Sequence, residues 1–86
     1  MTVSEVLEER GSRYGSFANN AKATQLSYRL FTNSKMPEEL HEAIHMICHK
    51  LARVNFGDHM HADNFIDIAG YATLAAEWIK EQNEQS

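Results

Sequence analysis

The chain has 86 residues, a formal net charge of −4 and one cysteine, Cys48. This length predicts a single small domain, residues 1–86, whose core is marginal unless something supplements it. A lone cysteine excludes an internal disulfide, which leaves a metal or a second subunit as the supplement. The acidic balance argues against nonspecific nucleic-acid binding, and the sequence contains neither a bilayer-length apolar run nor an N-terminal secretory pattern. We therefore expect a cytoplasmic homodimer or larger homo-oligomer.

The first two predicted helices lie on either side of a glycine-bounded turn. The segment "VSEVLEERGSRYG" predicts a short helix from about Ser4 to Arg10, followed by a turn through Gly11 and Gly15. The next segment, "SFANNAKATQLSYRLF", has helical periodicity with two apolar faces. One face holds Phe17, Ala21, Thr24, Tyr28 and Phe31, and the other holds Ala23, Leu26 and Leu30. Two apolar faces predict contact with two layers or with another chain.

The third predicted helix covers residues 37 to 55. Pro37 suits a first helical position, and Gly57 supplies a stop. Its apolar stripe consists of Leu40, Ile44, Ile47, Leu51 and Val54. A row of histidines, His41, His45 and His49, borders this stripe, and "HEAIH" matches the zinc-protease pattern H-E-x-x-H literally. Because a zinc protease also needs a third ligand and a cleft beside a sheet, we interpret these residues as partly exposed helix histidines.

The fourth predicted helix begins at about Ala62 or Asp63 and ends at about Gln82. Its broad apolar face carries Phe65, Ile68, Ala69, Ala72, Ala75, Ala76 and Ile79. Because Ala69, Ala72, Ala76 and Gly70 are small, another helix can approach closely. A second face carries Asp63, Asp67, Tyr71, Leu74 and Trp78, and it either meets another subunit or lines a cleft. No strand pattern competes anywhere. The predicted fold class is therefore all-α, a compact bundle of three main helices and a short N-terminal helix.

The acid pair Asp63 and Asp67 is the first candidate site. Carboxylates at positions i and i+4 project from one side of a helix and can share a magnesium ion. The alternative is that Asp63 caps the helix, or interacts with the helix dipole, as acids at this position commonly do. For Asp67, one turn further in and on the Tyr71 side, both interpretations remain open.

Cationic side chains form the second candidate site. Lys50 and Arg53 could hold a phosphate, pair with the aspartates across the helix interface, or complement the helix dipole. Arg10, Arg13 and Tyr14, around "RGSRYGSF", could add cationic and aromatic groups near two glycines. No phosphate-loop spacing accompanies them. Cys48 lies beside the core stripe, so nucleophilic catalysis has no support.

The segments "ERGSRYGSF", "HMICHKLARVNFGD" and "DNFIDIAGYATLAAEW" together resemble a family of short phage and prophage proteins with a domain of unknown function. More loosely, the order Y-G, K-x-x-R and D-x-x-x-D is similar to MazG-like and nucleotide-modification-associated all-α proteins. MazG-like enzymes are magnesium-dependent, oligomeric nucleoside triphosphate pyrophosphohydrolases with E-x-x-E and E-x-x-D motifs. Glu39 and Glu42 fit the first motif, but D-x-x-x-D replaces the second, so the resemblance implies phosphate binding more than hydrolysis.

These observations predict a phage or prophage accessory protein that binds a nucleotide or another phosphate ligand. Magnesium would be held by Asp63 and Asp67, and phosphates by Lys50 and Arg53. Tyr14 could stack on a base, and the remaining predicted ligand-binding residues are Arg13 and Tyr71. The alternative is a non-enzymatic interaction module that binds a host protein through the face that carries Tyr71 and Trp78.

Overall fold

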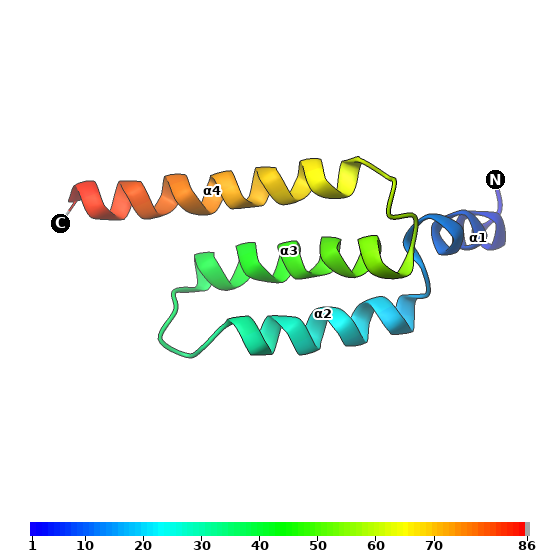
Figure 1. Ribbon diagram of the computed structural model, residues 1–86, viewed down its shortest axis with the longest axis horizontal. Coiled ribbons are helices and arrows are strands. Elements are labelled where there is room, and N and C mark those ends of the chain that lie inside the picture. The colour runs from blue at the N-terminus through cyan, green and yellow to red at the C-terminus, as the bar shows by residue number, and fades with distance from the viewer. Residues whose placement is uncertain (86) are drawn as a thin grey trace.

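A computed structural model describes residues 1–85, which form four α-helices and no strand. These are α1 (Val3–Tyr14), α2 (Phe17–Phe31), α3 (Glu38–Phe56) and α4 (Asp63–Gln85). The predicted all-α class is thus confirmed for this part of the chain. Helix α3 lies between α2 and α4, and α1 extends beyond one end of these three (Figure 1). The molecule is 51 Å long and 23 Å across, so it is more elongated than the compact bundle expected.

The helix starts follow local capping chemistry. The Thr2 side chain accepts the N–H of Glu5 at the start of α1, and Ser16 accepts the N–H of Asn19 at the start of α2. Helix α1 continues through Gly11 to Tyr14, one turn past the predicted end at Arg10. A glycine inside a helix costs only about 1 kcal/mol, which the flanking helix formers offset. The chain turns at Gly15 instead, where φ is +83°.

The deepest apolar positions are occupied by small side chains on the central helix. Among the described residues, Ala43, Cys48 and Ala52 are the apolar side chains classed as buried. Their size lets α2 and α4 approach α3 closely. The larger stripe predicted on this helix borders them and stays partly open, with Leu51 46% exposed. One chain alone therefore has a very small core.

The histidine row holds α2 against α3. The ring nitrogen Nε2 of His41 lies 2.9 Å from the carbonyl oxygen of Asn33, and Nδ1 lies 2.6 Å from the Tyr28 hydroxyl. Because a carbonyl only accepts, Nε2 carries the proton and Nδ1 accepts from Tyr28. The His45 ring packs edge-on against the same tyrosine, with ring centroids 5.2 Å apart. Within residues 1–85, no group of three or more His, Cys, Asp or Glu side chains could hold a metal ion.

Helix α4 turns its polar and aromatic stripe toward α3. Asn64 is buried there, and Asp67, Tyr71 and Trp78 are half-buried. The broad apolar face of α4 is largely exposed instead, with Phe65 53% and Ile79 41% exposed. The second face predicted for this helix therefore lines an intramolecular contact, and the broad apolar face lacks a neighbour within the described chain. No described helix is both long enough and apolar enough to cross a membrane.

Candidate functional site

The end of α1 and the turn that leads into α2 meet the end of α3. The backbone N–H of Asp58 donates to the carbonyl of Arg13 at 2.7 Å. A Cβ atom on Gly15 would overlap the backbone of Phe56, and one on Gly57 would overlap the backbone of Arg13 and Tyr14. Both glycines are needed because two stretches of backbone touch here. This contact fixes the end of α1 against the end of α3.

Tyr14 is the aromatic centre of this junction. The guanidinium of Arg53 lies over its ring, 4.2 Å from the centroid, in a cation–π contact. The His61 ring meets it edge-on at 5.9 Å. The aromatic residue of "RYG" and the arginine of K-x-x-R are therefore in contact.

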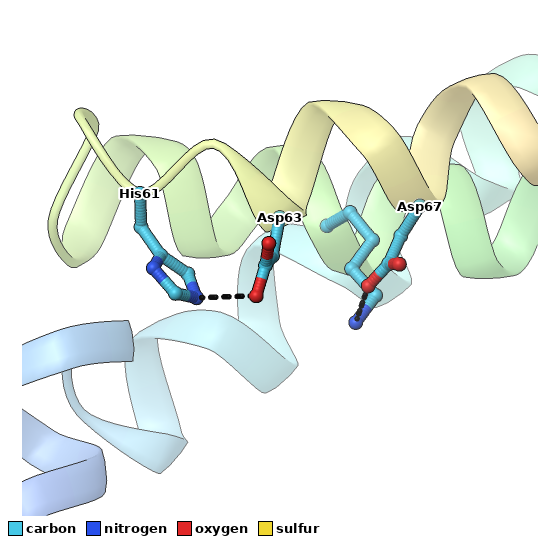
Figure 2. A network of polar contacts seen from close by, with 4 residues as sticks. His61, Asp63 and Asp67 are labelled. Atoms are coloured by element: carbon cyan, nitrogen blue, oxygen red, sulfur yellow. Dashed lines mark ion pairs between the residues drawn. The ribbon is translucent and has the colours of Figure 1, made fainter.

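The two aspartates lie beside different side chains. The Lys50 ammonium lies 2.9 Å from Oδ2 of Asp67, and Nε2 of His61 lies 3.6 Å from Oδ2 of Asp63. Figure 2 shows the side chains of His61, Asp63 and Asp67 on one side of the chain, with the two carboxylates directed to different partners. Lys50 is 14% exposed, so its charge is largely shielded from solvent. Magnesium at this acid pair stays a prediction, and binding there would compete with Lys50 for Asp67.

A pocket of about 410 Å³ opens beside the junction, between α1, the start of α2 and α3. We call it the basic pocket. Its lining residues are Leu7, Arg10, Gly11, Tyr14, Gly15, Ser16, Phe17, Asn20, His49 and Arg53. Two guanidinium groups and one imidazole line it, and no carboxylate does. In a chain of net charge −4, these two guanidinium charges favour an anionic ligand.

Asn20 supplies a buried acceptor at the basic pocket. The residue is 7% exposed, and its amide nitrogen donates to the carbonyls of Tyr14 and Ser16 at 2.7 and 2.8 Å. Its Oδ1 atom is buried and has no protein partner. Leaving such an oxygen unpaired costs free energy, so a ligand or water that donates an N–H or O–H is favoured here.

The burial and charge of the basic pocket change the pKa of His49. Burial, followed by the positive charges of Arg53, Lys50 and His45, lowers the pKa of the His49 imidazole below its ordinary value of 6.5. The imidazole is therefore neutral near pH 7. The repulsion behind part of this shift is what a bound anion would relieve. The start of α2, which carries no acidic residue in its first turn, also faces this pocket.

The predicted ligand-binding residues do not all share one site. Tyr14 and Arg53 line the basic pocket, whereas Lys50 is paired with Asp67 on the α4 side. Arg13 lines another pocket of about 250 Å³ on α1, which shares Arg10 and Tyr14 with the basic pocket. Tyr71 lies in a groove between α3 and α4. Asn20 and His49, which also line the basic pocket, were not predicted as site residues, whereas Arg10 was considered as a possible cationic group.

A groove of about 520 Å³ lies between α3 and α4. We call it the acidic groove. It is lined by Glu38, Glu39, Glu42, Ala43, Tyr71, Leu74, Ala75 and Trp78. Glu42 precedes Lys50 by eight residues, which is roughly 12 Å along a helix. The E-x-x-E segment therefore lies well away from Asp67, the partner of Lys50, and the two acidic motifs do not form one cage within a chain.

The fold and the site define a small all-helical protein with a cation-lined pocket at one end of the helix layer. The chain belongs to the DUF6378 family, a domain of unknown function, whose family profile matches residues 2–79. This match covers all four helices except the end of α4. Neither the curated proteins nor the solved structures gave a significant match.

Proposed function

We propose that this protein binds a small phosphate-bearing ligand, such as a nucleotide, in the basic pocket. The observation that carries the proposal is the composition of the lining. Arg10, Arg53 and His49 surround the space with no carboxylate among them, although the chain as a whole is acidic. The proposal concerns binding and assigns no reaction.

Each part of such a ligand has a matching group. Phosphate oxygens would accept from the guanidinium groups of Arg10 and Arg53 and from the free N–H groups at the start of α2. The unpaired Oδ1 of Asn20 would accept an N–H or O–H from the ligand. Magnesium would arrive with the phosphates, since in proteins it commonly keeps phosphate and water ligands.

Calorimetric titration of nucleoside triphosphates, with and without magnesium, tests this proposal. We expect the wild type to bind and Arg10→Gln to bind about tenfold more weakly, because a charge-assisted hydrogen bond is lost at a partly exposed site. Arg29→Gln is the matched control, since Arg29 is an exposed arginine on α2 outside the basic pocket. It should bind like the wild type.

Two results would contradict the proposal. One is no heat from the wild type with any nucleotide or with inorganic phosphate. The other is an equal loss of affinity in Arg10→Gln and Arg29→Gln, which would indicate a general charge effect instead of a site.

We also propose, from the resemblance to short phage and prophage proteins, an accessory role in the cytoplasm of a bacterial host cell. The small buried core supports a second part of this proposal, that the chain works as a homodimer or larger homo-oligomer.

A second candidate function is that of an interaction module that binds a host protein through the acidic groove. Tyr71, Leu74 and Trp78 form its apolar floor, and three glutamates lie along its α3 side. A partner would need an apolar segment with basic flanks. If this candidate is correct, Trp78→Ala should abolish capture of a stoichiometric host protein identified by mass spectrometry. Capture that survives this substitution would remove the candidate.

A further inference from the structure

Helix α3 has two long sides that neither α2 nor α4 covers. Its α2 side carries His41 and its α4 side carries Lys50, as their contacts show. At 100° per residue, the positions between these sides form two opposite rows. One row is charged or polar and includes Glu42, His49 and Arg53, which border the pockets. The other row is apolar and includes Leu40, Ile44 and Leu51.

Helices α2 and α4 also have one charged or polar side and one apolar side. Gln25 of α2 and Leu74 of α4 border pockets together with α3 glutamates, which places both on the charged side. The opposite side of α2 carries Leu30, and the opposite side of α4 carries its broad apolar face. We call this second side the apolar face, and its principal members are Leu30, Ile44, Leu51, Phe65, Ala72 and Ile79. Leu30 is 76% exposed and Phe65 is 53% exposed.

A single layer of helices with one apolar side is an incomplete domain, because stable domains bury apolar sides between two layers. The exposed area supports the same conclusion. A folded monomer of 9.8 kDa should expose about 5,200 Å². This chain exposes 6339 Å², which is roughly 1,100 Å² more. A standard interface buries about 800 Å² on each partner, so the excess is large enough to form one.

We propose that a second copy of this chain covers the apolar face, using its own apolar face. A protomer with three buried apolar side chains needs its second layer in order to stay folded. The covering partner must therefore be present whenever the chain is, and another copy meets that condition. Pairing like faces gives a closed two-fold dimer of two helix layers.

This dimer leaves the ligand proposal untouched, because the basic pocket opens on the charged side. Arg53 and His49 lie on the α3 row opposite Leu51. Loss of dimerisation and loss of ligand binding are therefore separable results. A variant that is monomeric and still binds nucleotide contradicts neither proposal.

Light scattering coupled to gel filtration tests the dimer over about a hundredfold range of protein concentration, since self-association follows mass action. We expect a dimeric wild type. Leu51→Glu should weaken dimerisation by about a hundredfold or more, because it places an unpaired charge at the centre of the interface. Leu74→Glu is the matched control. It makes the same substitution at an exposed leucine on the charged side and should stay dimeric.

Leu30→Glu provides a second test in case Leu51→Glu fails to fold, since the Leu30 side chain is mostly exposed in one protomer. Circular dichroism should show that the variant keeps its helical content. A wild type that is monomeric at every concentration would overturn the proposal. So would dimers that persist in both Leu51→Glu and Leu30→Glu, or that are lost in Leu74→Glu alone.

Discussion

Replacing Gly15 with alanine is expected to lower the free energy of unfolding by about 3 kcal/mol or more. Gly15 has φ +83° and ψ −174°, a backbone conformation that side chains with a Cβ rarely adopt. The added Cβ would also overlap the backbone of Phe56, which cannot move without shifting the end of α3. Since typical domains are stable by only about 5–15 kcal/mol, this loss is large enough to unfold much of the population.

Gly11→Ala is the matched control for this experiment. Gly11 lies inside α1, and a Cβ there would meet nothing within 4 Å. Alanine should therefore stabilise the protein by about 0.5–1 kcal/mol through its higher helix propensity. Urea denaturation followed by circular dichroism measures both variants. Equal stability of Gly15→Ala and the wild type would mean that the junction between α1 and α3 is not rigid.

The helices were predictable because local signals define them. Pro37, Gly57 and the apolar period determined α3 to within one residue at each end. The end of α1 was not predictable in the same way, since Gly11 and Gly15 are equal as local signals. Only the close approach of Phe56 requires glycine at position 15 and not at position 11. A tertiary contact therefore distinguishes Gly15 from Gly11 as the position where α1 ends.

Only some residues of the candidate site were predictable from the sequence. Tyr14 and Arg53 were identified from residue type, and a cross-helix pair between Lys50 and Asp67 was among the alternatives. Asn20 carried no such signal, because its role depends on an amide whose nitrogen caps two carbonyls and whose oxygen is left without a partner. His49 was likewise one of three histidines in a row, and the sequence did not distinguish it from His41 and His45. In the structure it lines the basic pocket beside α1 and α2.

The faces of α4 were the least predictable feature. Two stripes on one helix both suit burial, and hydrophobicity favours the one that contains Phe65, Ala72 and Ile79. In the structure α3 takes the other stripe, where Lys50 pairs with Asp67 and where Tyr71 and Trp78 line a groove with Ala43. The more apolar stripe is thus left available for a second chain.

Asp67→Ala is expected to lower the free energy of unfolding by about 2 kcal/mol, because it leaves the Lys50 ammonium without its partner. Lys50 is 14% exposed, so water replaces the carboxylate poorly, although the 44% exposure of Asp67 limits the effect. Asp63→Ala should cost less than about 1 kcal/mol, since its carboxylate is 71% exposed. Chemical denaturation without metal or nucleotide measures these differences.

The double variant Lys50→Met, Asp67→Ala separates a structural role of Asp67 from metal binding. Methionine has nearly the length of lysine but carries no charge, so the double variant should recover part of the stability lost in Asp67→Ala. Such recovery would mean that Asp67 serves first as the partner of Lys50. If instead magnesium alone raised the melting temperature of the wild type and left that of Asp67→Ala unchanged, Asp67 would be a metal ligand and Lys50 its competitor. Because one carboxylate oxygen lies 2.9 Å from the ammonium, the two roles compete at the same atoms, and the comparison decides between them.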